Sequence, residues 1–132
     1  MIFVIYKMEK IQASYNIVID ESYRNYCDII IDVFENDNLN YDLTDSKILN
    51  IIGLYYCNKI KNYVKMEKYY LMAIELKNVD GMYNLGFYYQ YVEKKYAKMK
   101  KYYLMAIELN DSRSMNNLGC YYDHVKKNYD EM

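Results

Sequence analysis

Apolar side chains in the C-terminal half of the chain recur at the spacing of an α-helix. Two stripes fall at positions i, i+3, i+4 and i+7: Met82, Leu85, Gly86 and Tyr89, and then Met99, Tyr102, Tyr103 and Ala106. Residues at this spacing share one helix face. The pattern therefore predicts two helices, over about residues 79–91 and 96–109.

The N-terminal half has a less regular pattern of the same kind. One stripe predicts an amphipathic helix over residues 22–35, with Asp20 or Ser22 as its N-cap: Tyr23, Tyr26, Cys27, Ile30, Ile31 and Phe34. A second stripe predicts a further helix upstream: Ile11, Tyr15, Val18 and Ile19. Residues 36–45 are rich in Asn and Asp, which predicts a loop.

The chain repeats itself with a period of 33 residues. Segments 68–76 and 101–109 both read KYYLMAIEL, and MYNLGFYY at 82–89 returns as MNNLGCYY at 115–122. An ungapped alignment of 67–99 with 100–132 has 19 identities in 33 positions, and a weaker copy lies one period upstream. Such a period is typical of helix–turn–helix arrays. It predicts units over residues 46–78 and 79–111, followed by a truncated unit over 112–132.

Glycine stands at the same place in each unit, as Gly53, Gly86 and Gly119. Within a helix, glycine costs about 0.5–1 kcal/mol relative to alanine, so its recurrence implies a compensating gain. We expect a neighbouring helix to approach closely at these positions. Ala73 and Ala106 would serve the same end on the second helix of each unit.

The run AIELNDSRSMNNLG at 106–119 resembles the join between successive Sel1-like repeats, a tetratricopeptide-type family, and 73–86 has the same layout. KMKKYY at 98–103 is similar to the family's K-A-x-x-W-Y. The family's join glycine is replaced by Lys77 or Asn110, and its Gly-x-Gly-Val turn is missing. The Tyr-, Asn- and Lys-rich style resembles repeat proteins of giant DNA viruses of amoebae.

The resemblance implies an all-α fold, a short right-handed α-solenoid over residues 46–132 with capping helices and a loop over 1–45. In such arrays the first helix of each unit lines a groove that holds a peptide. The groove-facing positions carried over to this chain are Lys47, Asn50, Leu54, Cys57 and Asn58; Asp80, Tyr83, Phe87, Gln90 and Tyr91; and Arg113, Asn116, Cys120, Asp123 and His124.

The second and third units agree along the core stripe but differ at all five groove positions. Such variation is expected of a surface that determines binding specificity. It is equally expected of a solvent-exposed face that binds nothing. Tyr83, Phe87 and Tyr91 form the sharpest candidate, because exposed Tyr clusters favour protein contact. The alternative is local packing against the next helix.

No set of residues predicts catalysis, a metal site or a cofactor. Cys120 and His124 are one helix turn apart, but two ligands are too few for zinc. Glu75 and Glu108 recur as helix-surface charges do. The lone histidine lacks the pattern of a catalytic triad, and the isolated glycines form no phosphate loop. We therefore expect a non-enzyme.

The charge balance argues against a dedicated nucleic-acid or membrane binder, since 17 basic and 18 acidic side chains give a net charge of −1. One basic cluster lies among tyrosines and is interpreted as a solvated helix face: Lys94, Lys95, Lys98, Lys100 and Lys101. The 3 cysteines suit a reducing compartment. No stretch approaches the roughly 20 apolar residues of a membrane span, and the N-terminus lacks signal-peptide flanks. These features predict a cytoplasmic protein, in the host cytoplasm if it is viral.

Together the patterns predict a non-catalytic adaptor that binds a peptide or protein partner. One alternative is a self-assembling module, a homodimer joined through the truncated C-terminal repeat. There the last helix, about 112–124, would lack its partner and leave Leu118, Tyr121 and Tyr122 partly exposed, although fraying would explain this equally. Another is an accessory subunit of a viral nucleic-acid enzyme or defence system, acting through the lysine cluster.

Overall fold

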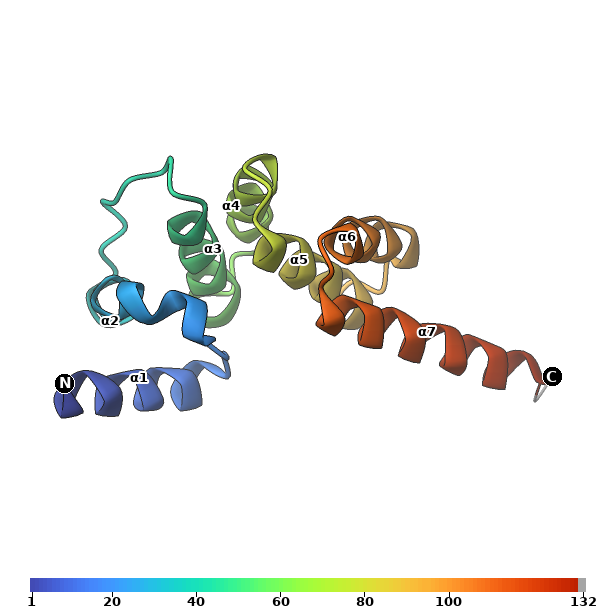
Figure 1. The fold of residues 1–132 in the computed structure, drawn as a ribbon, viewed down its shortest axis with the longest axis horizontal. Coiled ribbons are helices and arrows are strands. Elements are labelled where there is room, and N and C mark those ends of the chain that lie inside the picture. Colours follow the sequence, from blue (N-terminus) through green and yellow to red (C-terminus); the bar gives the residue numbers. More distant parts are fainter. Residues whose placement is uncertain (131–132) are drawn as a thin grey trace. The chain divides into compact units, whose positions relative to one another are not determined.

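Helices make up every regular element of residues 1–130, which are the residues that the computed structural model describes (Figure 1). The all-α prediction is thereby confirmed. The last two residues of the predicted third repeat, 131–132, lie outside the described residues. The chain divides into two units, Met1–Leu76 and Lys77–Met132.

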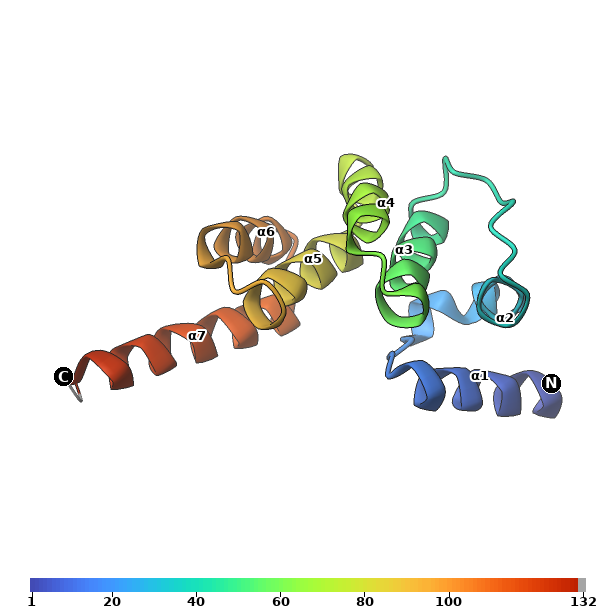
Figure 2. The ribbon, with the colours of Figure 1, turned by 180° about the vertical axis from the view of Figure 1, so that it is seen from behind.

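The first unit is built from six helical segments. They are α1 (Ile2–Tyr15), the 3₁₀ helix η1 (Glu21–Tyr26), α2 (Cys27–Asn36), α3 (Ser46–Leu54), the π-helical segment η2 (Tyr55–Ile60) and α4 (Tyr63–Glu75). Helices α1 and α2 pack against each other, and both views show α1 below α2 (Figure 2). Their core centres on Ile30, Val33 and Phe34, with Ile51 of α3 beside them.

The N-terminal helices differ from the predicted ones in their limits. The predicted upstream helix included Val18 and Ile19, but α1 ends at Tyr15 because Asn16 takes a left-handed φ of 53°. The predicted helix over 22–35 is divided into η1 and α2. Asp20 is confirmed as the cap, since its carboxylate accepts the Ser22 backbone N–H at 2.8 Å.

The second unit contains α5 (Val79–Tyr91), α6 (Tyr96–Glu108) and α7 (Ser112–Asp130). Helices α5 and α6 form a hairpin, and α7 packs against both. The predicted limits of α5 are confirmed, and α6 ends one residue earlier than expected. The prediction that the last helix ends near residue 124 is wrong. Residues 125–130 contain neither Gly nor Pro, so no local signal stops α7 there.

The sequence repeat is also a repeat of packing within the two hairpins. A Cβ added at Gly53 would meet the ring of Tyr70, and one added at Gly86 would lie 2.5 Å from Cδ1 of Tyr103. The expected close approach is therefore confirmed at both glycines. The expectation fails at Gly119, where an added Cβ would meet nothing within 4 Å.

A stacked tyrosine pair repeats in the same way. The rings of Tyr56 and Tyr69 lie 5.5 Å apart and 15° from parallel, and those of Tyr89 and Tyr102 lie 6.0 Å apart at 14°. Both partners are displaced by 33 residues between the hairpins. The stack thus fixes the same helix pairing twice.

Left-handed residues end several of the helices. Lys77 and Asn110 have φ values of 60° and 64°. These are angles that glycine adopts without strain and other residues rarely adopt. After Asn110, Asp111 caps α7 by accepting the backbone N–H of Ser114 at 3.0 Å.

Candidate protein-binding surface

The groove stripe predicted on α3 is covered by the N-terminal segment of the same chain. Asn50 is only 2% exposed, and its side-chain amide donates to the Tyr23 hydroxyl at 2.9 Å. Lys47 donates to the backbone carbonyl of Ser22 at 2.6 Å. The prediction that Asn50 belongs to an accessible groove is therefore wrong, because a buried, satisfied amide cannot meet a partner.

The remaining positions of this stripe, on α3 and η2, also face the first unit itself. Leu54 packs against the core of the first unit, and Asn58 donates to the backbone carbonyl of Tyr15 at 2.9 Å. Cys57 is half-buried, and desolvation raises the pKa of its thiol. The first unit thus fills its own predicted groove.

The second unit presents an aromatic row on α5, formed by Tyr83, Phe87 and Tyr91. Successive rings lie one helix turn apart, with centroids separated by 6.1 Å and then by 4.7 Å. Phe87 is 43% exposed and Tyr91 is 51% exposed. Local packing therefore leaves much of these two rings uncovered, whereas Tyr83 is half-buried.

A buried hydrogen-bond network lies behind the aromatic row. The Tyr103 hydroxyl donates to Oε1 of Gln90 at 2.6 Å. The Asn117 amide donates to the Tyr103 hydroxyl at 3.2 Å and to the Tyr83 hydroxyl at 3.5 Å. Burial raises the pKa of Tyr103 well above its ordinary value, which keeps this phenol protonated as a donor.

This network occupies the side chain of Gln90, which is 8% exposed and connects α5 to α6, so Gln90 offers little of the accessible surface predicted for it. Satisfied buried networks make the surrounding structure rigid. The hydrogen bonds behind the aromatic row therefore join all three helices of the unit and hold the row in place.

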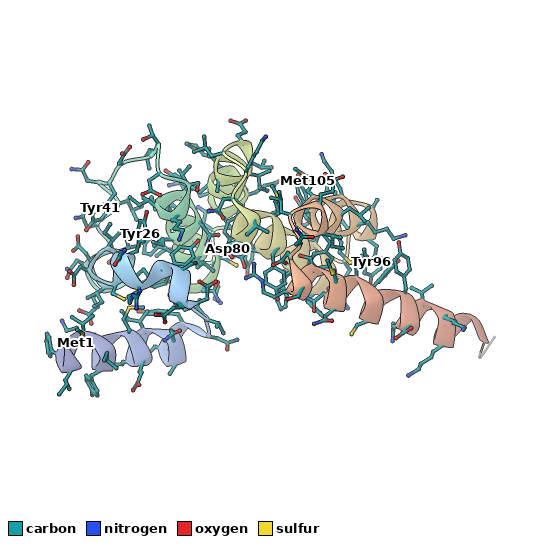
Figure 3. The ribbon with its side chains drawn as sticks, viewed as in Figure 1. Met1, Tyr26, Tyr41, Asp80, Tyr96 and Met105 are labelled. Carbon is teal, nitrogen blue, oxygen red and sulfur yellow. The ribbon has the colours of Figure 1, made fainter. Side chains whose placement is uncertain are left out.

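Arg113 packs against the Tyr83 end of the aromatic row. Its guanidinium lies 4.4 Å from the centroid of the Tyr83 ring, a cation–π contact. The same group donates to the Asp80 carboxylate at 2.8 Å and to the Asp111 carboxylate at 2.9 Å. Asp80 and Arg113 therefore neutralise each other (Asp80 is labelled in Figure 3).

A cleft of about 340 Å³ opens at the Tyr91 end of the row, next to α7. We call it the end cleft. Its lining residues are Gln90, Tyr91, Lys94, Tyr96, Cys120, Tyr121 and His124. Tyr96, labelled in Figure 3, belongs to the start of α6, and its ring centroid lies 4.9 Å from that of Tyr121 on α7.

The groove positions of α7 are open to solvent beyond Arg113. Asn116, Cys120, Asp123 and His124 are all exposed. The expectation that Leu118 is partly exposed is wrong, since it is 6% exposed, but Tyr122 is 49% exposed. Only Cys120 and His124 of this stripe line the end cleft.

The structure therefore brings together Gln90, Tyr91, Cys120 and His124 from the predicted stripes and adds Lys94, Tyr96 and Tyr121, which the predicted groove did not include. The helix stripes could not assign them to one site, because Lys94 lies after α5, Tyr96 starts α6, and Tyr121 joins them only through the packing of α7 on Tyr96.

Within the described chain, no three His, Cys, Asp or Glu side chains gather as metal ligands. None of the helices over residues 1–130 has the length and apolar character needed to cross a membrane. Comparisons with protein-family models, with curated proteins and with solved structures give no match to this chain.

Proposed function

We propose that this chain is a Sel1-like, non-catalytic adaptor that binds a peptide or protein partner through the aromatic row on α5. The main support is that Phe87 and Tyr91 are exposed, while the hydrogen-bond network behind them fixes the position of the row. Aromatic side chains are enriched among the residues that dominate binding energy at interfaces. A rigid backing reduces the entropy that such side chains lose on binding.

Two observations support the Sel1-like part of the proposal. The glycine–tyrosine contact and the tyrosine stack recur at the repeat period in both hairpins. Lys77 and Asn110 have left-handed backbones at the positions where the family carries glycine. In both cases the resemblance predicts a specific local structure at a specific position, and the structure has that feature there.

The test compares affinity captures from the cells that produce the protein. The variant Phe87→Ala/Tyr91→Ala removes two exposed rings without touching the buried network. The matched control is Phe3→Ala/Tyr6→Ala on α1, which removes the same residue types at 67% and 61% exposure. Helix content measured by circular dichroism should be unchanged in both variants.

We expect a specific protein to be captured by the wild type and the α1 control and lost with the α5 variant. Truncating a residue that dominates an interface costs about 2 kcal/mol or more, which is roughly thirtyfold in affinity. Equal capture by all three proteins would refute the row as the binding surface. Recovery of the chain alone would favour self-association instead, for which the exposed Tyr122 and Val125 of α7 are available.

A further inference from the structure

We infer that the end cleft receives an acidic group of the partner, next to an apolar or aromatic side chain that packs on the aromatic row. The inference rests on the proposed function and specifies its ligand as an acidic peptide segment. It follows from the charges that line the cleft, from its continuity with the row and from its size.

The charges lining the end cleft have one sign. Lys94 is a cation, His124 adds a ring N–H donor, and no carboxylate is among the lining residues. Neither residue forms an ion pair with a side chain that the structure describes. The neighbouring Lys95, in contrast, pairs with Glu93 at 3.0 Å.

The charge distribution of the chain strengthens this asymmetry. Residues 77–132 carry 9 basic and 7 acidic side chains, a balance of +2, whereas residues 1–76 carry 8 and 11, a balance of −3. In the second unit, Asp80 and Asp111 both bind Arg113. One guanidinium offsets only one of these two carboxylates. The other side chains of residues 77–132 comprise 8 basic and 5 acidic groups, a balance of +3 that attracts an anionic segment.

The geometry joins the cleft to the aromatic row, because Tyr91 belongs to both. Its ring centroid lies 4.7 Å from that of Phe87. Residues along an extended peptide rise by about 3.3 Å each. A peptide side chain that packs on Phe87 therefore has its next neighbour on the same face two residues on, about 6.6 Å away, in the direction of Tyr91 and the cleft that Tyr91 lines.

Single-stranded nucleic acid is the competing anionic ligand, since such sites combine cations with aromatic rings. They require a continuous basic track, however, and the lysines of this region are dispersed over tyrosine rings. Lys98 lies 5.2 Å from the Tyr89 centroid and Lys101 lies 5.3 Å from the Tyr102 centroid. The geometry therefore favours a peptide.

The first experiment selects binders from a displayed library of random dodecapeptides. We expect an aromatic or large apolar residue flanked by Asp or Glu. Selection on Lys94→Gln/His124→Gln should retain the aromatic preference and lose the acidic one. Wild-type-selected peptides should bind this variant about tenfold more weakly, the scale of one charge-assisted hydrogen bond. The matched control, Lys126→Gln/Lys127→Gln, neutralises two exposed lysines of α7 outside the cleft.

Cys120 provides a second readout, because its exposed thiol lines the cleft while Cys27 and Cys57 are half-buried elsewhere. A selected synthetic peptide should slow alkylation of Cys120 by N-ethylmaleimide and leave the rates at Cys27 and Cys57 unchanged. An unprotected Cys120 would overturn the assignment of the peptide to the cleft.

The outcomes separate this inference from the proposed function. The inference of an acidic ligand is overturned if peptides selected on Lys94→Gln/His124→Gln are still enriched in Asp and Glu, or if those selected on the wild type are not. Either result leaves the proposed role of the aromatic row unaffected. Selections that are unaffected by Phe87→Ala/Tyr91→Ala overturn the row itself. Protection of Cys120 by an oligothymidine but not by the selected peptides would replace the peptide with nucleic acid.

Discussion

Replacing each repeat glycine by alanine should have opposite effects at equivalent positions. Gly53→Ala and Gly86→Ala add a methyl group against a tyrosine ring, and Gly119→Ala adds it to open space. At Gly86 the new carbon would lie 2.5 Å from Cδ1 of Tyr103, whereas carbon atoms pack at about 3.5–4.0 Å. The ring cannot retreat easily, because Tyr103 is fully buried and its hydroxyl is hydrogen-bonded.

The magnitudes follow from two opposing terms. Overpacking a core costs about 1–3 kcal/mol, and replacing a helical glycine with alanine recovers about 0.5–1 kcal/mol. We expect a net loss of about 1–2 kcal/mol for Gly86→Ala and a similar loss for Gly53→Ala, where Tyr70 is 1% exposed. Gly119→Ala retains only the gain, about 0.5–1 kcal/mol.

Thermal and urea unfolding followed by circular dichroism measure these differences. Each kcal/mol corresponds to about 4 °C in Tm for a chain of this size. Gly86→Ala should therefore melt several degrees below the wild type and Gly119→Ala slightly above it. An unchanged Tm for Gly86→Ala, or a loss for Gly119→Ala, would refute the packing argument.

Two further predictions concern backbone strain and pH. Lys94→Gly should raise the free energy of unfolding by about 0.5 kcal/mol in urea denaturation, because Lys94 has a left-handed φ of 56°. Asn110→Gly should gain less, because Asn tolerates the left-handed region better than Lys. Equal gains in the two variants would contradict the strain argument. Stability should also fall as pH rises from 10 toward 12. The hydrogen bond to Asp32 raises the pKa of Tyr41 to about 12, and burial raises the pKa of Tyr55 to about 12. Above the ordinary value of 10.0 the unfolded chain loses these protons first, which favours unfolding. A urea midpoint that stays constant over this range would exclude the effect.

The sequence by itself determined the α5–α6 hairpin of the second unit. The limits of α5 and α6 follow from helical periodicity, and the 33-residue period identifies the positions whose packing recurs. Gly53 and Gly86 could be assigned to close contacts because a helical glycine is costly unless a neighbour needs the space. These properties depend on residues that are near in sequence or related by the repeat, so one chain contains enough information to find them.

Only the tertiary structure decided which predicted groove residues are accessible. Asn50 and Gln90 occupy the expected stripe, yet Tyr23 and Tyr103 bind them in the interior. Periodicity places a residue on a helix face, but the neighbouring segment determines whether that face meets solvent. The end cleft required the same information, because Lys94 and His124 are brought together only when α7 packs against the α5–α6 hairpin.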